Sequence, residues 1–283
     1  MRRRRLEESI FKGLMLFSLA AIAGILLTIL VMVTLKGLPA LNLDMVTQTP
    51  KGGYYLGKEG GILNAIVGSL YLAVGATVLA FLISLPVALY LQRDYAGKTR
   101  MAGLVRLFLD ILWGIPSIVY GAFGFVVMLY LGIRASLLGG VIALTLLEIP
   151  VLARAMDEVI GTVSADLKDA SYALGATRWE TAIKVTVRQT LPGILTAVLL
   201  AFGRGIGDAA SILFTAGYTD RVPTSPFDPV ASLPLAIFFQ LGTPFPEVQR
   251  RAYASAVILL AIVLLISIGS RLLSKRFTKH VVK

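Results

Sequence analysis

Four charged residues interrupt stretches of the sequence that are otherwise apolar: Glu148, Arg154, Arg204 and Asp208. A charged side chain at the centre of a bilayer costs roughly 2.5–3.5 kcal/mol on insertion scales, so we expect each to face a partner or a wetted path. Arg204 and Asp208 stand four residues apart, which predicts that they share one face of a helix. The planar guanidinium suits an oxyanion such as phosphate. Two interpretations stay open: a structural ion pair of Arg204 with Asp208 or Glu148, and a pair that opens to admit an anion.

Three glycines flank this arginine, at positions 203, 205 and 207. They do not form a dinucleotide-binding fingerprint, because no strand precedes them and their spacing is wrong. Small residues in a membrane helix let two backbones approach closely. We therefore expect this part of the chain to pack closely against a second subunit or to shape a narrow pore.

A semi-polar stretch separates two long apolar stretches in the second half of the chain, and it begins Asp169-Ala170-Ser171. Its small residues predict a helix, and Gly175 predicts a turn or a close backbone approach. Arg178 adds positive charge suited to an acidic partner. Two membrane spans can be joined by a much shorter loop, so we interpret this one as a docking surface for a soluble partner. An ordinary helical connector is the alternative.

The composition excludes several kinds of catalytic site. The chain has no cysteine, which excludes thiolate metal sites and disulfides, and its single histidine, His280, lies in a basic tail. Gly97-Lys98-Thr99 is not a phosphate-binding loop, because Gln92 stands where the motif needs its first glycine and no strand precedes it. We therefore expect no enzymatic activity and no nucleotide, metal or other cofactor bound by this chain.

The elements that must position these groups are long apolar helices. The chain has 283 residues, of which 57% are apolar and 15% charged, whereas soluble domains are about 45–50% apolar. A span needs about 20 apolar residues, and only helices or closed barrels satisfy the backbone in lipid. The sequence therefore predicts an all-α membrane protein with six transmembrane helices, with kinks at Pro116 and Pro150. The stretches of sufficient length are residues 14–35, 62–91, 106–131, 135–156, 193–215 and 252–274.

The distribution of basic residues predicts the orientation of these spans. The net charge is +11, and the basic residues gather at the ends of apolar stretches. Nineteen Lys and Arg fall on the side that holds both termini and the docking loop, against seven on the other side. The positive-inside rule then places both termini in the cytoplasm. The first apolar stretch lacks a persuasive cleavage site, so we expect it to be a retained span.

Two segments on the opposite side are rich in Gly, Pro and aromatic residues. One contains Gly52-Gly53-Tyr54-Tyr55, and the other extends from Thr224 to Pro246. Within the second, residues 229–241 are apolar but too short to span a bilayer, which predicts a re-entrant or interfacial helix.

The docking loop resembles the EAA loop of ABC importer permeases, which seats in a groove of the ATPase. The family usually has Glu at the position of Asp169 and an I-x-L-P pattern at the position of Val185 to Arg188; here Leu191-Pro192 follows a few residues later. Two further stretches, Asp110 to Gly121 and Leu191 to Ala216, are similar to the phosphate permeases within this family. The resemblance extends from Gly60 to the C-terminus.

This resemblance implies a type I ABC importer (MetI-like) fold and a multi-pass protein of the cell membrane that carries inorganic phosphate inward. The implied partners are a second permease subunit, an ATPase dimer that holds ATP and Mg, and an extracytoplasmic phosphate-binding protein. Arginines matching Arg154 and Arg204 are thought to line the pathway in the family. The implied parts are a leading segment (1–60), a permease domain (61–275) with a coupling loop (157–192), and a basic tail (276–283).

Two other functions remain open on the sequence. The same machine could carry another oxyanion, such as molybdate, sulfate or a phosphonate, since Arg204 suits any of them. An ion-driven carrier without an ATPase is the alternative from another class. Such carriers often show inverted repeats, and we find none, while the long polar loop would have no purpose in them.

Overall fold

The computed structural model describes residues 2–51, 59–92 and 94–277. Gly52 to Tyr55 and His280 lie outside the described residues, as does most of the basic tail. A two-stranded antiparallel hairpin pairs β1 (Pro50–Lys51) with β2 (Glu59–Gly60). All other regular elements in the described ranges are helical: α1 (Arg2–Gly37), η1 (Leu38–Ala40), α2 (Leu43–Thr47), α3 (Leu63–Tyr90), α4 (Arg100–Gly114), α5 (Ser117–Tyr130), α6 (Leu137–Gly161), α7 (Ala165–Ala173), α8 (Arg178–Glu180), the π-helix η2 (Thr181–Val187), α9 (Arg188–Gly207), α10 (Leu233–Leu241) and α11 (Pro246–Phe277).

Long apolar helices dominate the described chain. Five of them are long and apolar enough to cross a membrane, and the bent pair of α4 and α5 raises the number to six if it forms one span. The prediction of an all-α membrane protein is therefore confirmed. The expected re-entrant or interfacial segment at 229–241 contains the short helix α10.

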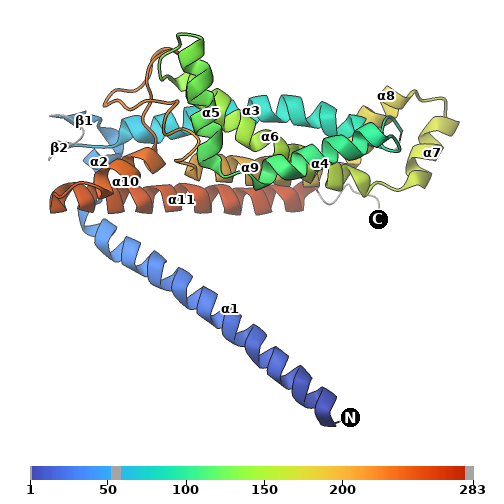
Figure 1. Cartoon of the computed structure of the whole chain (residues 1–283), viewed down its shortest axis with the longest axis horizontal. Coiled ribbons are helices and arrows are strands. Elements are labelled where there is room, and N and C mark those ends of the chain that lie inside the picture. Colours follow the sequence, from blue (N-terminus) through green and yellow to red (C-terminus); the bar gives the residue numbers. More distant parts are fainter. Residues whose placement is uncertain (1, 52–58, 93, 278–283) are drawn as a thin grey trace.

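Helices α3 and α6 form the centre of the bundle, α9 packs on both, α4 and α5 pack on α6, and α11 lies outside against α9 and α10 (Figure 1). Alanines line the buried face of α3, among them Ala73, Ala76 and Ala80, all with no exposed surface. Lipid tails are as apolar as leucine, so helices in a bilayer gain most from close van der Waals contact, which small residues allow. The tight pairing of α3 and α6 follows from these small side chains.

The third predicted span is broken. Helices α4 and α5 meet at an angle of 99°, with Ile115 and Pro116 both in extended conformation between them. Proline has no N–H and disfavours helical backbone in the residue before it, so it ends α4. The predicted kink at Pro116 is therefore confirmed as a sharp bend, whereas Pro150 lies inside the continuous helix α6.

The fifth predicted span has different bounds from those expected. Helix α9 starts at Arg188 and ends at Gly207, and Asp208 follows in extended conformation. The expectation that Arg204 and Asp208 share a face in the middle of one helix is therefore wrong. Two causes end the helix early: the alternating glycines lower its helical propensity, and the Asp208 carboxylate accepts a hydrogen bond from the Ser211 N–H at 2.8 Å, which stabilises a turn.

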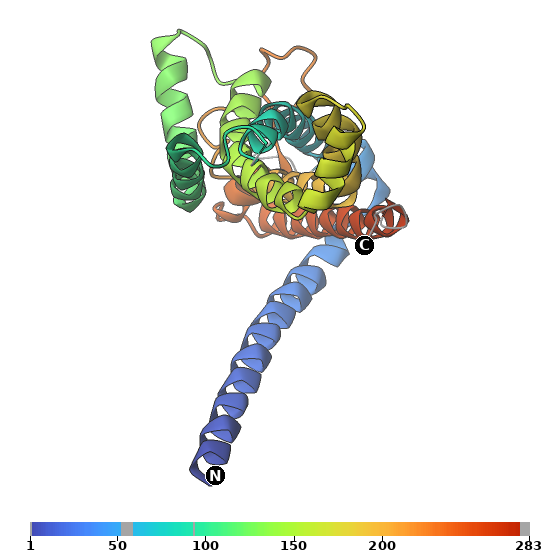
Figure 2. The same ribbon diagram turned by 90° about the vertical axis from the view of Figure 1, so that its right-hand side faces the viewer.

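Helix α1 leaves the bundle at an angle and runs away from the other helices (Figures 1 and 2). No part of its most apolar window is buried inside the chain. It meets α11 at its C-terminal end, where Gly37 lies directly against Tyr253 and the Lys36 ammonium lies 5.0 Å from the centre of the Tyr253 ring. Its apolar surface is therefore left for lipid or another subunit.

Candidate functional site

The end of α9 holds two of the predicted charged residues. Arg204 lies in the last turn and is exposed. Within the described ranges, no hydrogen bond or ion pair holds its guanidinium. Asp208 instead caps the following turn, where its carboxylate accepts from both the backbone N–H and the hydroxyl of Ser211. The two residues therefore do not form the ion pair that the sequence left open.

Glu148 approaches this helix end from α6. Its side chain is completely buried, and neither carboxyl oxygen has a hydrogen-bond partner. Arg204 and Asp208 both act on it electrostatically, and Thr77 lies close by without an acceptable hydrogen-bond geometry. A Cβ on Gly205 would collide with Glu148 Oε1, so the carboxyl packs directly on the α9 backbone. At Gly205 this close contact is with α6 of the same chain, and the predicted packing against a second subunit stays a prediction.

The bend between α4 and α5 lies beside the segment that follows α9. The Tyr120 hydroxyl in α5 donates to the Leu112 carbonyl in α4 at 2.7 Å and so bridges the bend. A Cβ on Gly121 would stand 2.7 Å from the carbonyl oxygens of Ala210 and Ser211. The structure therefore brings the broken span, the end of α9 and the buried carboxyl of α6 into one region.

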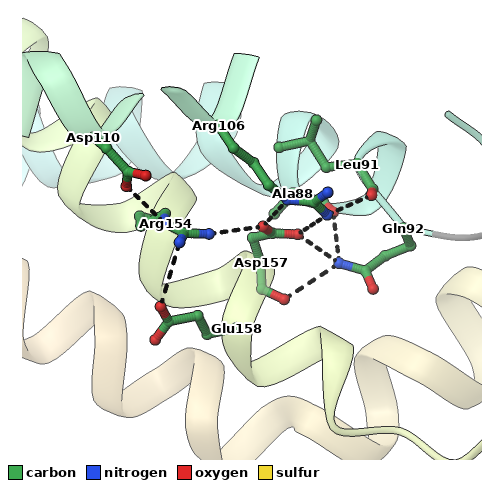
Figure 3. A network of polar contacts seen from close by, with 8 residues as sticks. All are labelled: Ala88, Leu91, Gln92, Arg106, Asp110, Arg154, Asp157 and Glu158. Carbon is green, nitrogen blue, oxygen red and sulfur yellow. Dashed lines mark hydrogen bonds and ion pairs between the residues drawn. The ribbon is translucent and has the colours of Figure 1, made fainter. Parts of the chain in front are cut away.

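Arg154 belongs to a different cluster, centred on Asp157 (Figure 3). The Asp157 carboxylate accepts from Arg106 Nε at 2.7 Å and Nη2 at 3.0 Å, from Gln92 Nε2 at 2.9 Å and from Arg154 Nη1 at 3.3 Å. Only 5% of the Asp157 side chain is exposed, so these bonds satisfy a buried charge. The cluster ties together the end of α3, the start of α4 and the last turns of α6.

Arg154 is held on both sides within this cluster. Its Nε donates to Asp110 at 2.8 Å, and Nη2 lies 3.9 Å from the exposed Glu158 carboxylate. The sequence analysis missed Asp110, Asp157 and the other members of the network. A signal for one of them was available, because Asp157 follows Arg154 by three residues, a spacing typical of an ion pair once the helix continues past the predicted end at 156.

The docking loop is a helix, a turn and a second helix. Asp169, Ala170 and Ser171 lie in α7, and Gly175 has φ +84°, a left-handed conformation that glycine adopts without strain. Thr177 and Glu180 then form a reciprocal capping box that starts α8, where Arg178 is the first residue. The turn at Gly175 follows the sequence prediction, and the capped second helix is new.

The tip of this loop lies at one end of the bundle (Figure 1) and exposes two large apolar side chains. Leu174 is 90% exposed and Trp179 is 67% exposed. Two large apolar side chains on a rigid, capped turn are suited to binding another protein. The geometry therefore supports a docking surface better than an ordinary connector.

Comparison with known proteins shows the family to which these features belong. Residues 84–281 match the family described as binding-protein-dependent transport system inner membrane component. The chain is 35% identical over 240 residues to the phosphate transport system permease protein PstA of Haemophilus influenzae, which covers 84% of this chain and 83% of that protein. The chain belongs to this family of transport permeases.

Other similar proteins agree with that assignment. The permease PstA of Yersinia pestis is 34% identical over 248 residues, covering 88% of this chain and 83% of the relative. An inward-facing structure of the MetNI methionine ABC transporter has a TM-score of 0.63 at 21% identity, covering 76% of this chain and 95% of that chain. The similarity to this transporter structure establishes the MetI-like fold.

Membership in this permease family has three consequences. The chain is a multi-pass membrane protein and a permease component of an ABC transport system. It is not the catalytic subunit, since the permeases of such systems work with a separate ATPase. The ATP-independent carrier that the sequence left open is therefore set aside.

Proposed function

We propose that this chain is the permease subunit through which an ATP-driven importer moves inorganic phosphate into the cell. The observation that carries the proposal is its similarity over more than four-fifths of its length to two phosphate permeases. Arg204 supports it, because this exposed guanidinium at the end of α9 is not held by an ion pair within the described ranges. A free planar cation is suited to an anion with several oxygen atoms.

We place the substrate path at the end of α9, along Arg204, with Asp208 and Glu148 beside it. The Asp208 carboxylate keeps the region from being uniformly positive, so a bound anion can also be released. Arg154 was predicted from the resemblance to line the same path. Its guanidinium is held by Asp110 and Asp157, so it would meet an anion only after those pairs open.

The proposed assembly follows from the docking loop and the family. An ATPase dimer of the PstB type, which carries ATP and Mg, would bind the loop around Asp169 and Gly175. A second permease of the PstC type would complete the path, and a PstS-type binding protein would deliver phosphate on the other side. This chain would hold no cofactor itself. Both termini and the docking loop would then lie in the cytoplasm, as the basic residues predict.

The proposal is tested by phosphate uptake into proteoliposomes that contain the complete complex and ATP. We expect Arg204→Gln to lower uptake about ten- to hundredfold, the effect of losing a charged hydrogen bond in the pathway. Copurification of the ATPase should stay unchanged. Arg134→Gln is the matched control, because Arg134 is also exposed but lies in the loop between α5 and α6. Full uptake by the Arg204 variant would remove this residue from the path.

The same vesicles decide between phosphate and another oxyanion. A complex that imports labelled phosphate and is not inhibited by excess sulfate, molybdate or a phosphonate supports the proposed substrate. Uptake of one of those anions in place of phosphate would assign the chain to a different importer. Mass spectrometry of the proteins that copurify with the chain would identify the ATPase and the second permease independently of transport.

A further inference from the structure

A series of polar contacts, joined by short runs of backbone, begins in the docking loop. The Lys168 ammonium in α7 lies 3.0 Å from the Asp94 carboxylate, in the loop that follows α3. The Lys168 side chain is 10% exposed and that of Asp94 is 25% exposed, so water screens this pair less than a surface pair. Helix α7 is therefore fixed to the α3–α4 loop and does not hang free of the bundle.

The series continues from that loop into α6 through Gln92, whose main-chain oxygen accepts from the N–H groups of Tyr95 and Gly97 at 3.1 and 2.9 Å. Gln92, two residues before Asp94, donates to the carboxylate and the main-chain oxygen of Asp157 at 2.9 and 3.3 Å. Arg106 binds the same carboxylate through two nitrogens and also donates to the Leu91 carbonyl at 2.7 Å. Asp157 thus joins three helices at one point (Figure 3).

The series ends at the bend in the broken span. Arg154 joins Asp157 to Asp110, which lies one turn before the end of α4. Two residues later the Leu112 carbonyl accepts from Tyr120 in α5, across the bend. Tyr120 is buried, and the next residue, Gly121, packs directly on the carbonyls of Ala210 and Ser211, in the segment that follows α9. Polar contacts and short runs of backbone therefore connect α7 to the region of the candidate substrate path.

We infer that this series of contacts, from Lys168 through Asp157 and Arg154 to Tyr120, transmits movement of the docking loop to the α4–α5 bend. The inference rests on the proposed function, because it requires an ATPase that moves the loop. Asp157 and Arg154 are positioning residues in this scheme, because they act through the pairs that they form with Arg106 and Asp110. Multidentate ion pairs of low exposure resist separation, so the joined helix ends move as one body.

A cavity of about 730 Å³ lies between the docking loop and this network and contains polar groups of both. Its lining includes Arg106, Asp157, Lys168 and Asp169. Apolar packing therefore does not fill the space between α7 and the ends of α4 and α6. The polar contacts around this cavity are therefore one route by which motion of α7 can reach α4, beside the packing of α7 on η2, and each contact can be tested individually.

The test uses the reconstituted complex and three readouts: ATPase bound, ATP hydrolysed, and phosphate moved per ATP. We expect Lys168→Gln at one end and Asp110→Asn at the other to keep the ATPase bound and active. Transport per ATP should fall about tenfold, within the usual range of coupling between sites. The double exchange Lys168→Asp with Asp94→Lys should restore transport per ATP, because it forms the same ion pair with the charges reversed.

The matched control is Lys184→Gln. Lys184 forms a 3.0 Å ion pair with Glu180 in the same loop, but this exposed pair lies outside the series. Transport per ATP should therefore stay at the wild-type value. The double variant Lys168→Gln with Asp110→Asn should be no worse than the poorer single variant, since two breaks in one series are not additive.

Two results would overturn the inference. One is an unchanged ratio of transport to hydrolysis in both single variants. The other is loss of the assembled complex in both, which would make the network a purely structural element. The wild-type complex tests the proposed function by itself, because a wild-type complex that moves no phosphate would contradict that function. The inference about the contacts is tested separately, by comparing each variant with the wild type.

Discussion

At the scale of single residues, the structure separates two arginines that the sequence placed together. Arg204 is exposed and unpaired within the described ranges, while Arg154 is held by Asp110 and Asp157. The difference follows from their neighbours, since α9 offers glycines around Arg204 and α6 offers an acid one turn from Arg154. Burial of Glu148 against Gly205 then fixes how closely α6 and α9 approach.

The close approach of Glu148 to Gly205 predicts that adding one methyl group at position 205 lowers the stability of the chain. A Cβ at Gly205 would collide with Glu148 Oε1, so Gly205→Ala should lower the stability of the purified chain by about 1–3 kcal/mol, the usual effect of overpacking. Thermal unfolding in detergent measures it. Gly203→Ala is the control, because nothing lies within 4 Å of the added atom. The control should keep or gain stability, since alanine favours a helix over glycine. An equal gain in Gly205→Ala would show that the Glu148 side chain moves aside and that this contact does not decide the result.

At the scale of elements, the docking loop owes its shape to one conformation. Gly175 has φ +84° and ends α7, and the capping box of Thr177 and Glu180 starts the next helix at once. Leu174 and Trp179 are therefore presented on either side of a fixed turn. A rigid surface loses little conformational entropy when a partner binds.

Gly175→Ala tests this role of the turn. A left-handed conformation costs a residue with a Cβ roughly 1–2 kcal/mol, so the turn should open and the amount of copurified ATPase should fall. Gly132→Ala is the matched control. Gly132 also has a positive φ and open space around it, but it lies after α5, outside the loop. If both variants retain the ATPase equally, the conformation at Gly175 does not matter for docking.

At the scale of the whole molecule, the docking loop and the segment around α10 lie at opposite ends of the bundle (Figure 1). The proposed orientation puts the first in the cytoplasm and the second on the other side. The absence of cysteine from the sequence makes this easy to check, because any introduced thiol is the only one.

Trp179→Cys and Phe227→Cys provide the check on orientation. Both positions are exposed, Trp179 at 67% and Phe227 at 68%. In intact cells, a membrane-impermeant thiol reagent should label position 227 and leave position 179 unlabelled until the membrane is opened. The reverse pattern would invert the proposed topology.

Long-range contacts mark the limit of what the sequence predicted. Apolar length predicted the spans, and Pro116 predicted the break, because both effects are local. The end of α9 was misplaced because its apolar pattern continues past Gly207, where an aspartate side chain stabilises a turn instead. Asp157 was missed because three of its donors come from Gln92 and Arg106, 65 and 51 positions away. Such contacts exist only once α3, α4 and α6 are packed.

The bend between α4 and α5 also determines where lipid can touch this subunit. Main-chain carbonyls before Pro116 lose their helical donors there, and hydrocarbon offers none in return. Tyr120 satisfies the Leu112 carbonyl, and the remaining backbone at the bend needs water or protein. Acyl chains must therefore stop short of this elbow. In the assembled transporter, the bend between α4 and α5 therefore marks the boundary between the lipid-facing surface of the subunit and its hydrated interior.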